Sequence, residues 1–160
     1  QLAHTPLIVV CAGAKAILDL PATLEYLETW SVPVVGFGTD DFPAFYSRSS
    51  GLKTSAQAAT PREVVQLANA HWGIGMNSAV LVANPPPAET ALPVDFVEQA
   101  VQQALADAER LQVRGQAVSP FLLGRMSELT HGGSLAANLS LLINNARLAA
   151  QVAVALAQGV

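Results

Sequence analysis

The stretch that decides the fold lies at residues 7–19 and reads Leu7-Ile-Val-Val-Cys-Ala-Gly-Ala-Lys-Ala-Ile-Leu-Asp19. Its five leading apolar residues, with Pro6 before them, predict a buried strand over residues 6–11. A strand that is apolar at every position is covered on both faces, which is typical of a parallel sheet between two layers of helices. Three small residues then end the strand, and a single lysine, Lys15, follows them.

The rest of the chain alternates in the same way between apolar strands and helices. Two further buried strands are predicted over residues 32–37 and 78–83, and residues 44–57 show only short extended pieces. Ser119-Pro120 is expected to cap the fourth helix. Helices are predicted over residues 22–30, 60–72, 94–111, 119–130 and 132–157. We therefore expect an α/β fold: a three-layer sandwich with a mainly parallel sheet, forming an incomplete part of a larger single fold.

The composition is unusually apolar for one domain of 160 residues. Charged residues make up 12% of the chain and the mean hydropathy is +0.37, yet no run of about 18 apolar residues indicates a membrane span. The apolar excess therefore needs protein to cover it, either in an oligomer or in a larger fold. A net charge of −4 with eight scattered basic residues argues against nucleic acid as a partner. The single cysteine, Cys11, excludes an internal disulfide and indicates a cytoplasmic protein.

Lys15 is the candidate nucleophile. It is one of two lysines, and the nearest acidic residue in sequence is Asp19. Ligands of open α/β sheets gather at the carboxyl ends of the strands, where residues 12–15, 36–41 and 84–87 are expected. A lysine held at such a strand end and stripped of water would have a lowered pKa and offer a neutral amine. The pattern alone leaves open a lysine that reaches past the strand into water.

Other polar groups carry weaker signals. Asp40 and Asp41 could bind a metal or form a solvated turn, and the three histidines show no metal-ligand spacing. The segment before Ala16 is no phosphate-binding loop, because that position needs Ser or Thr. Asn138 and Asn145 lie seven residues apart and so share one face of the last helix. Their amides are expected to bond either a neighbouring loop or a ligand.

Several segments in order, spread over nearly the whole chain, resemble one known family. They lie at residues 9–19, 23–29, 42–45, 49–51, 82–85, 120–123, 128–130, 134–135, 138 and 144–146. The chain is similar over residues 1–160 to the C-terminal half of pseudouridine-5'-phosphate glycosidase, a family that includes the indigoidine synthase A-like proteins. The motif around Lys15 carries most of this resemblance.

The resemblance implies an enzyme, a carbon–oxygen lyase that reversibly cleaves the C–C glycosidic bond of pseudouridine 5'-phosphate to uracil and ribose 5-phosphate. Lys15 matches the family's nucleophile, which forms an imine-like adduct at ribose C1', and Asn138 matches an asparagine that positions the substrate. The alternatives are another Schiff-base enzyme acting on a sugar phosphate, and a non-catalytic oligomerising fragment.

The resemblance also implies parts that this chain lacks. Family members are about twice as long, and their acid, phosphate contacts and manganese-binding aspartate lie in an N-terminal half. The Mn²⁺ ligand is therefore expected upstream of Gln1, no metal ligand is expected within the chain, and the chain alone is expected to be inactive. The family further implies a homotrimer, small-molecule substrates and no membrane or nucleic-acid partner.

Overall fold

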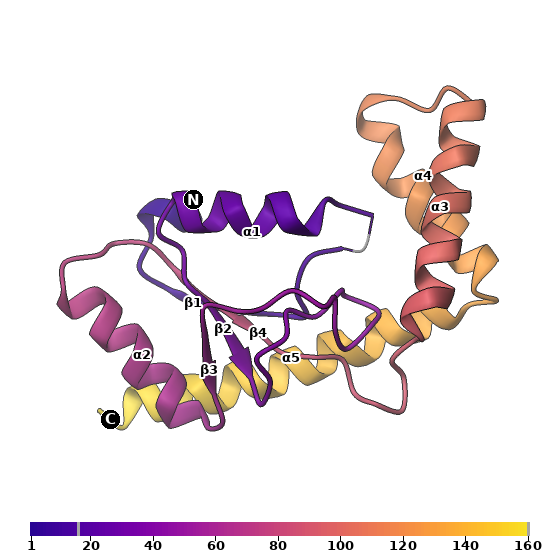
Figure 1. The fold of residues 1–160 in the computed structure, drawn as a ribbon. Coiled ribbons are helices and arrows are strands. Elements are labelled where there is room, and N and C mark those ends of the chain that lie inside the picture. Colours follow the sequence, from indigo (N-terminus) through magenta and orange to yellow (C-terminus); the bar gives the residue numbers. More distant parts are fainter. Residues whose placement is uncertain (16, 160) are drawn as a thin grey trace.

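The computed structural model describes residues 1–15 and 17–159 and shows a four-stranded parallel sheet between helices (Figure 1). Ala16 lies outside the described residues. The strands are β1 (Ile8–Cys11), β2 (Val34–Phe37), β3 (Ala56–Ala58) and β4 (Val80–Ala83), in the spatial order β1-β4-β2-β3. All three pairings are parallel, with Val10 opposite Val82 and Val35 opposite Val82 on the other side. The predicted α/β fold with a parallel sheet is confirmed.

Helices cover both faces of this sheet, so the sandwich has the three layers that the apolar strands predict. The helix α1 (Leu20–Thr29) packs on one face, where its leucines meet Val34 and Leu81. The helices α2 (Pro61–Gly73) and α5 (Gly133–Ala157) pack on the other face, around Val80, Val82 and Leu148. Alternate residues of a strand point to opposite faces, which is why β1 and β4, covered on both faces, are apolar at every position.

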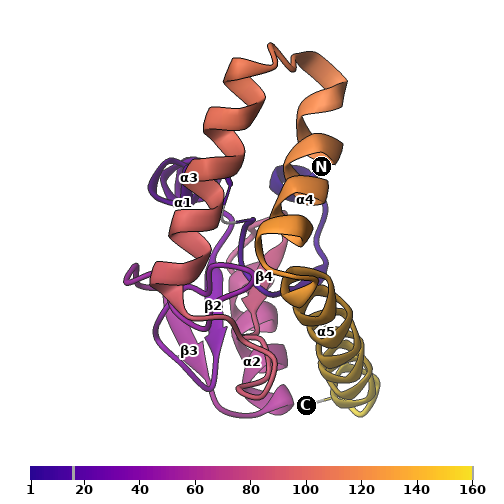
Figure 2. The same ribbon diagram turned by 90° about the vertical axis from the view of Figure 1, so that its right-hand side faces the viewer.

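The remaining helices form an arm beside the sheet. The helices α3 (Val94–Arg110) and α4 (Val118–Leu129) pack against each other and stand away from the sheet in both views (Figures 1 and 2). A core of their own holds them together, with Val101 and Met126 among its buried residues, and buried Tyr46 joins that core. Two short 3-10 turns, Leu2–His4 and Gly115–Ala117, complete the elements.

One short strand and one helix start qualify the sequence predictions. The strand β3 overlaps the end of residues 44–57, where short extended pieces were predicted, and its pairing with β2 supplies order that three small or polar residues do not encode. The second prediction, a cap at the start of the fourth helix, is wrong. Ser119-Pro120 does not cap α4. That helix already begins at Val118, after a 3-10 turn, and its first turn has no side-chain cap.

Other helix starts follow local chemistry. Thr60 accepts a hydrogen bond from the Glu63 backbone N–H at 3.2 Å, and Pro61 occupies the first turn of α2. Asp19 caps α1 by accepting from the Ala22 N–H at 2.9 Å, a cap that directly follows the Lys15 segment. The site-bearing loop after β1 is therefore bounded by a strand on one side and a capped helix on the other.

Candidate functional site at the carboxyl end of the sheet

The structure brings the three predicted strand-end segments to one edge of the sheet. The Asn84 N–H donates to the Cys11 carbonyl at 2.7 Å, which joins the ends of β4 and β1. Gly13 forms an isolated bridge with Ala44, and the loop after β2 therefore lies against the loop that carries Lys15. This edge is where parallel sheets bind ligands.

Gly13 allows the close approach of these two loops. Its φ is +82°, in the left-handed region that L-residues rarely adopt, and a Cβ at this position would overlap the carbonyl oxygen of Pro43. The Phe45 N–H also donates to the Ala12 carbonyl at 3.0 Å. The path of the chain from β1 to Lys15 is thus set by backbone contacts with residues 43–45.

Lys15 is half-buried at this edge, and its backbone carbonyl accepts from the Leu18 N–H at 2.9 Å. Across the described residues, no carboxylate lies within ion-pair distance of its amine. The sequence left open a desolvated lysine and a lysine that reaches into water. Lys15 lies between these two environments, because its side chain is partly buried.

The other lysine has a different environment. Lys53 Nζ lies 2.9 Å from Asp40 Oδ2 and 2.9 Å from Asp41 Oδ1. Hydrogen bonding to Asp40 and Asp41 raises the pKa of Lys53, and the Lys53 hydrogen bond lowers the pKa of Asp41. These carboxylates are thus engaged by an ammonium.

No metal site is assembled by the residues that the structure describes. Within them, no group of three or more His, Cys, Asp or Glu side chains lies close enough to hold an ion. The carboxylates of Asp40 and Asp41 also face a cation, Lys53. The donor set of this chain does not fit Mn²⁺, so we derive no step through a metal.

The two asparagines of α5 differ in their contacts. Asn145 Oδ1 accepts from Asn84 Nδ2 at 3.0 Å, and Asn144 Nδ2 donates to the Pro85 carbonyl at 3.3 Å. These bonds tie α5 to the loop after β4, which is one of the two alternatives left open for Asn145. Asn138 is half-buried, and no hydrogen bond to its side-chain amide is found in the described parts of the chain. Its amide is available for a ligand.

A cavity of about 420 Å³ opens beside this edge. Three serine hydroxyls line it, and Ser49 Oγ donates to Asp41 Oδ2 at 2.9 Å while Ser50 Oγ donates to the Phe42 carbonyl at 2.6 Å. Residues of α3 form the other wall, where three valines are joined by Glu98 and Gln102. The cavity therefore has a mixed polar and apolar lining, which suits a small polar ligand.

The contacts of two residues near the site, Tyr46 and Asn84, were not predicted from the sequence. Tyr46 is buried beside α3 and hydrogen-bonds Ser134 at the start of α5, and burial raises the pKa of its phenol. Asn84 is buried and spans from β4 to α5. The segment 84–87 was expected at this edge, but no local pattern gives the partner of either residue, because each partner lies in an element more than 60 residues away in sequence.

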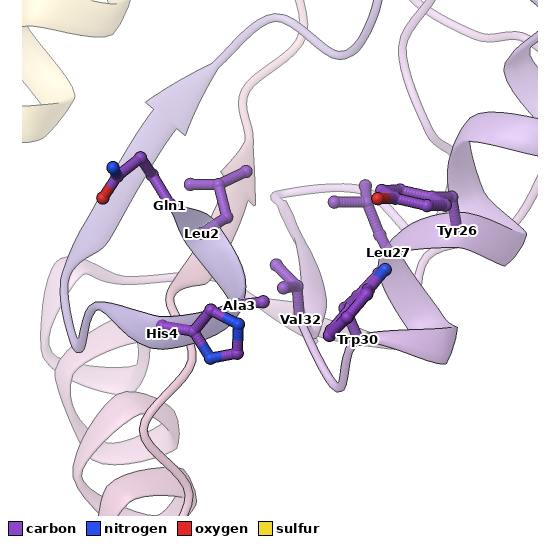
Figure 3. A pocket seen from close by; sticks show the side chains of 8 residues that line it. All are labelled: Gln1, Leu2, Ala3, His4, Tyr26, Leu27, Trp30 and Val32. Atoms are coloured by element: carbon purple, nitrogen blue, oxygen red, sulfur yellow. The ribbon is translucent and has the colours of Figure 1, made fainter.

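A second cavity of about 280 Å³ lies at the opposite end of β1 and α1 (Figure 3). Its aromatic wall is formed by His4, Tyr26 and Trp30, with the His4 and Trp30 ring centroids 5.8 Å apart. The lining residues are Gln1, Leu2, Ala3, His4, Tyr26, Leu27, Trp30 and Val32. This cavity precedes β1, whereas Lys15 follows it, so it takes no part in the candidate site.

The chain belongs to the indigoidine synthase A like protein family, whose model matches residues 1–155. Among its relatives are proteins named pseudouridine-5'-phosphate glycosidase from Gemmatimonas aurantiaca and Caldanaerobacter subterraneus. They are 52% and 50% identical to it, over 99% and 98% of this chain and 52% and 51% of their own lengths. The chain thus spans about half the length of the curated relatives it matches.

Solved structures agree with this membership. One is the prealnumycin C-glycosynthase AlnA in complex with ribulose 5-phosphate, with 34% identity and a TM-score of 0.89 over 99% of this chain and 53% of that one. Another is an indigoidine synthase A-like protein from Thermotoga maritima, with 36% identity and a TM-score of 0.86 over 97% of this chain and 51% of that one. The family predicted from the motif around Lys15 is confirmed.

Proposed function

We propose that this chain supplies the lysine-bearing half of a pseudouridine-5'-phosphate glycosidase, with Lys15 as the covalent nucleophile. The single observation that carries the proposal is the place of Lys15 at the carboxyl end of β1, half-buried and without a carboxylate partner in the described residues. The names of the relatives and the ribulose 5-phosphate in one structural neighbour support a sugar phosphate as the substrate.

A C–C glycosidic bond explains why a lysine would be needed. Carbon is a poor leaving group, so the bond is cleaved more easily once C1' is part of an electron sink. In the proposed reaction the C1'–O4' bond breaks, O4' keeps the bonding electrons and takes up a proton from the general acid, and the Lys15 amine adds to C1' with loss of a proton. The C1'–C5 bond then breaks, its electrons take up a proton on uracil, and water hydrolyses the remaining imine to ribose 5-phosphate and the free amine.

Asn138 is proposed to position this substrate. Its amide can donate and accept hydrogen bonds, and it is half-buried without a protein partner among the described residues. Asn145, in contrast, is bonded to Asn84. The proposal therefore gives a ligand-binding role to Asn138 and a structural role to Asn145.

The general acid, the phosphate contacts and a Mn²⁺ ligand are proposed to come from the part of the relatives that this chain does not match. The chain alone is accordingly proposed to be inactive. A homotrimeric assembly and a cytoplasmic location remain proposals that follow from the family resemblance and from the apolar composition.

Borohydride trapping tests the role of Lys15. This chain would replace the matching part of the Gemmatimonas aurantiaca relative, and the chimera would be reduced in the presence of ribose 5-phosphate. The expected adduct maps to Lys15 after digestion, and the matched control Lys53→Arg leaves it unchanged. An adduct at Lys53 alone, or none with an active chimera, would refute the assignment.

The likeness to a C-glycosynthase favours one alternative, in which the same lysine adduct forms a C–C bond to an acceptor other than uracil. Comparing uracil with larger aromatic acceptors in the chimera separates the two. Product formation only with the larger acceptors would favour the alternative.

A further inference from the structure

The helix α5 is apolar on its outer side as well as on its inner side. Its inner side is buried through residues such as Leu141, Leu148 and Val152. The outer side carries a continuous stripe of exposed apolar residues: Leu135, Leu139, Leu142, Ile143, Ala146, Ala150, Ala153, Val154 and Ala157. Of the helices described, α5 is the one long and apolar enough to cross a membrane by length and composition. A helix that is hydrophobic all round is normally buried, so the outer stripe needs a cover.

The strand β1 presents a second uncovered surface. It is an edge strand in the described sheet, with β4 on one side only. The Leu7 carbonyl accepts from Val80 and the Cys11 carbonyl from Asn84. Because backbone groups alternate in direction along a strand, Ile8 and Val10 direct their N–H and C=O groups to the free edge. An apolar edge with unpaired backbone groups is a template for another strand.

The two elements that carry these surfaces are in contact. The helix α5 contacts β1 and α2, and it runs the length of the sheet beside α2 (Figures 1 and 2). Ile8 and Val10 belong to the same core cluster as Leu148 and Val152 of α5. A polypeptide that pairs with β1 would therefore also reach α5.

We infer that the free edge of β1 and the outer stripe of α5 together form the docking surface for the polypeptide that makes up the other half of the relatives' length. That polypeptide adds a strand beside β1 and covers the apolar stripe. The occupant follows from length, since relatives about 50% identical are about twice as long as this chain. The inference rests on family membership, and it holds whether or not Lys15 is the nucleophile.

The paired surfaces favour a protein over a lipid bilayer as the cover. Lipid would satisfy the apolar stripe of α5, but it offers no hydrogen bonds to the backbone groups of Ile8 and Val10. A strand satisfies these groups, and its own side chains or its helices bury the stripe. A second copy of this chain and a bilayer become outcomes of the test.

Co-expression provides the test. The 160-residue chain, tagged, would be produced with the unmatched part of the Gemmatimonas aurantiaca relative. A one-to-one complex is expected after purification, with the amides of Ile8 and Val10 protected from hydrogen exchange only in the complex. The amide of Val9, which faces β4, is expected to be protected in both states.

Substitutions locate the surface. Val10→Pro removes the N–H that faces the free edge and leaves the β4 ladder intact, whereas Val10→Ala loses similar packing but keeps that N–H. Leu139→Lys places a charge on the stripe, and Ile74→Lys places one on an apolar residue that is 80% exposed at the end of α2. Loss of the complex is expected for Val10→Pro and Leu139→Lys, and retention for the two controls.

Circular dichroism tests whether each variant is folded. If Val10→Pro unfolds the chain, Leu139→Lys still tests the inference, because the Leu139 side chain is exposed and its replacement should not disturb the core. Lys15→Ala is expected to retain the complex, which separates this inference from the catalytic proposal. Three results would overturn the inference: no complex with the unsubstituted chain, a complex that survives both Val10→Pro and Leu139→Lys, or the same two variants abolishing a homo-oligomer or vesicle binding instead.

Discussion

Lys15 follows β1, whereas Lys53 precedes β3 and lies against the loop that follows β2. Lys53 contacts two carboxylates, which hold it as an ammonium and raise its pKa. Lys15 has no such partner among the described residues and is half-buried. The comparison shows that being one of only two lysines in the sequence does not by itself identify a residue as a nucleophile. The absence of a neighbouring anion separates the two amines.

The largest expected effect tests this difference directly. In the chimera with the Gemmatimonas aurantiaca relative, Lys15→Arg keeps the positive charge but removes the nucleophilic amine. Cleavage of pseudouridine 5'-phosphate is expected to fall by roughly 10³-fold or more, the order seen when a covalent nucleophile is lost. Lys53→Arg is the matched control and should retain most activity, as measured by uracil release. Equal losses in both variants would end the distinction between the lysines.

The loop after β1 and the loop after β2 each contain a glycine with a positive φ, and they differ in the space that a larger side chain would find there. Gly13 has a φ of +82° and no room for a Cβ beside Pro43, whereas Gly38 has a φ of +66° and open space around it. Gly38→Ala is expected to cost about 1–2 kcal/mol for the left-handed backbone alone. Gly13→Ala adds the steric overlap and should cost roughly 2–5 kcal/mol. Urea unfolding of the two variants measures this, and similar costs would show that the loops tolerate change equally.

The two asparagines of α5 allow the same kind of comparison as the two lysines. One side chain, Asn145, has a protein partner, and the other, Asn138, has none among the described residues. Asn145→Ala leaves the buried amide of Asn84 without its partner and is expected to destabilise the chain by about 1–3 kcal/mol. Asn138→Ala removes no protein hydrogen bond seen in the described residues, so it should barely change stability. It is expected instead to raise the KM of the chimera. A large loss of stability in Asn138→Ala would give that residue a structural role.

The smallest effect concerns pH. The lowered pKa of Asp41 contributes stability that is present above the ordinary aspartate pKa, near 4, and is lost as the pH falls through the folded value. The raised pKa of Lys53 contributes stability that is present below the ordinary lysine pKa, near 10.4, and is lost at higher pH. Lys53→Met should move the pKa of Asp41 upward, as followed by carboxyl NMR shifts between pH 2 and 6. An unchanged Asp41 titration would contradict the contact.

Much of this architecture is predictable from sequence because strand and helix patterns are local. The apolar run at residues 7–11 predicts a covered parallel strand, and the edge position of Lys15 follows from it. For β3 only short extended pieces could be predicted, since Ala56-Gln57-Ala58 has no apolar pattern and its place in the sheet comes from its pairing with β2. The start of α4 was missed because a 3-10 turn precedes it and no side chain caps it.

The site is predictable in a more limited way. The motif around Lys15 indicates the family, and the family model and the relatives confirm it. The ion pairs of Lys53 and the bond between Asn84 and Asn145 depend on residues 12 to 61 positions apart. Such contacts arise from the packing of distant elements, and the spacing along one helix or loop does not encode them.

Cys11 gives the edge strand a chemical reporter of its own. It is the single thiol of the chain, it lies in β1, and burial raises the pKa of its thiol. Only the thiolate reacts with alkylating or disulfide reagents, so a partly buried thiol with a raised pKa reacts more slowly than an exposed cysteine. The rate of thiol labelling therefore reports on the surroundings of β1 in the unsubstituted protein. Adding a polypeptide that closes this edge is expected to slow that rate, with no substitution introduced.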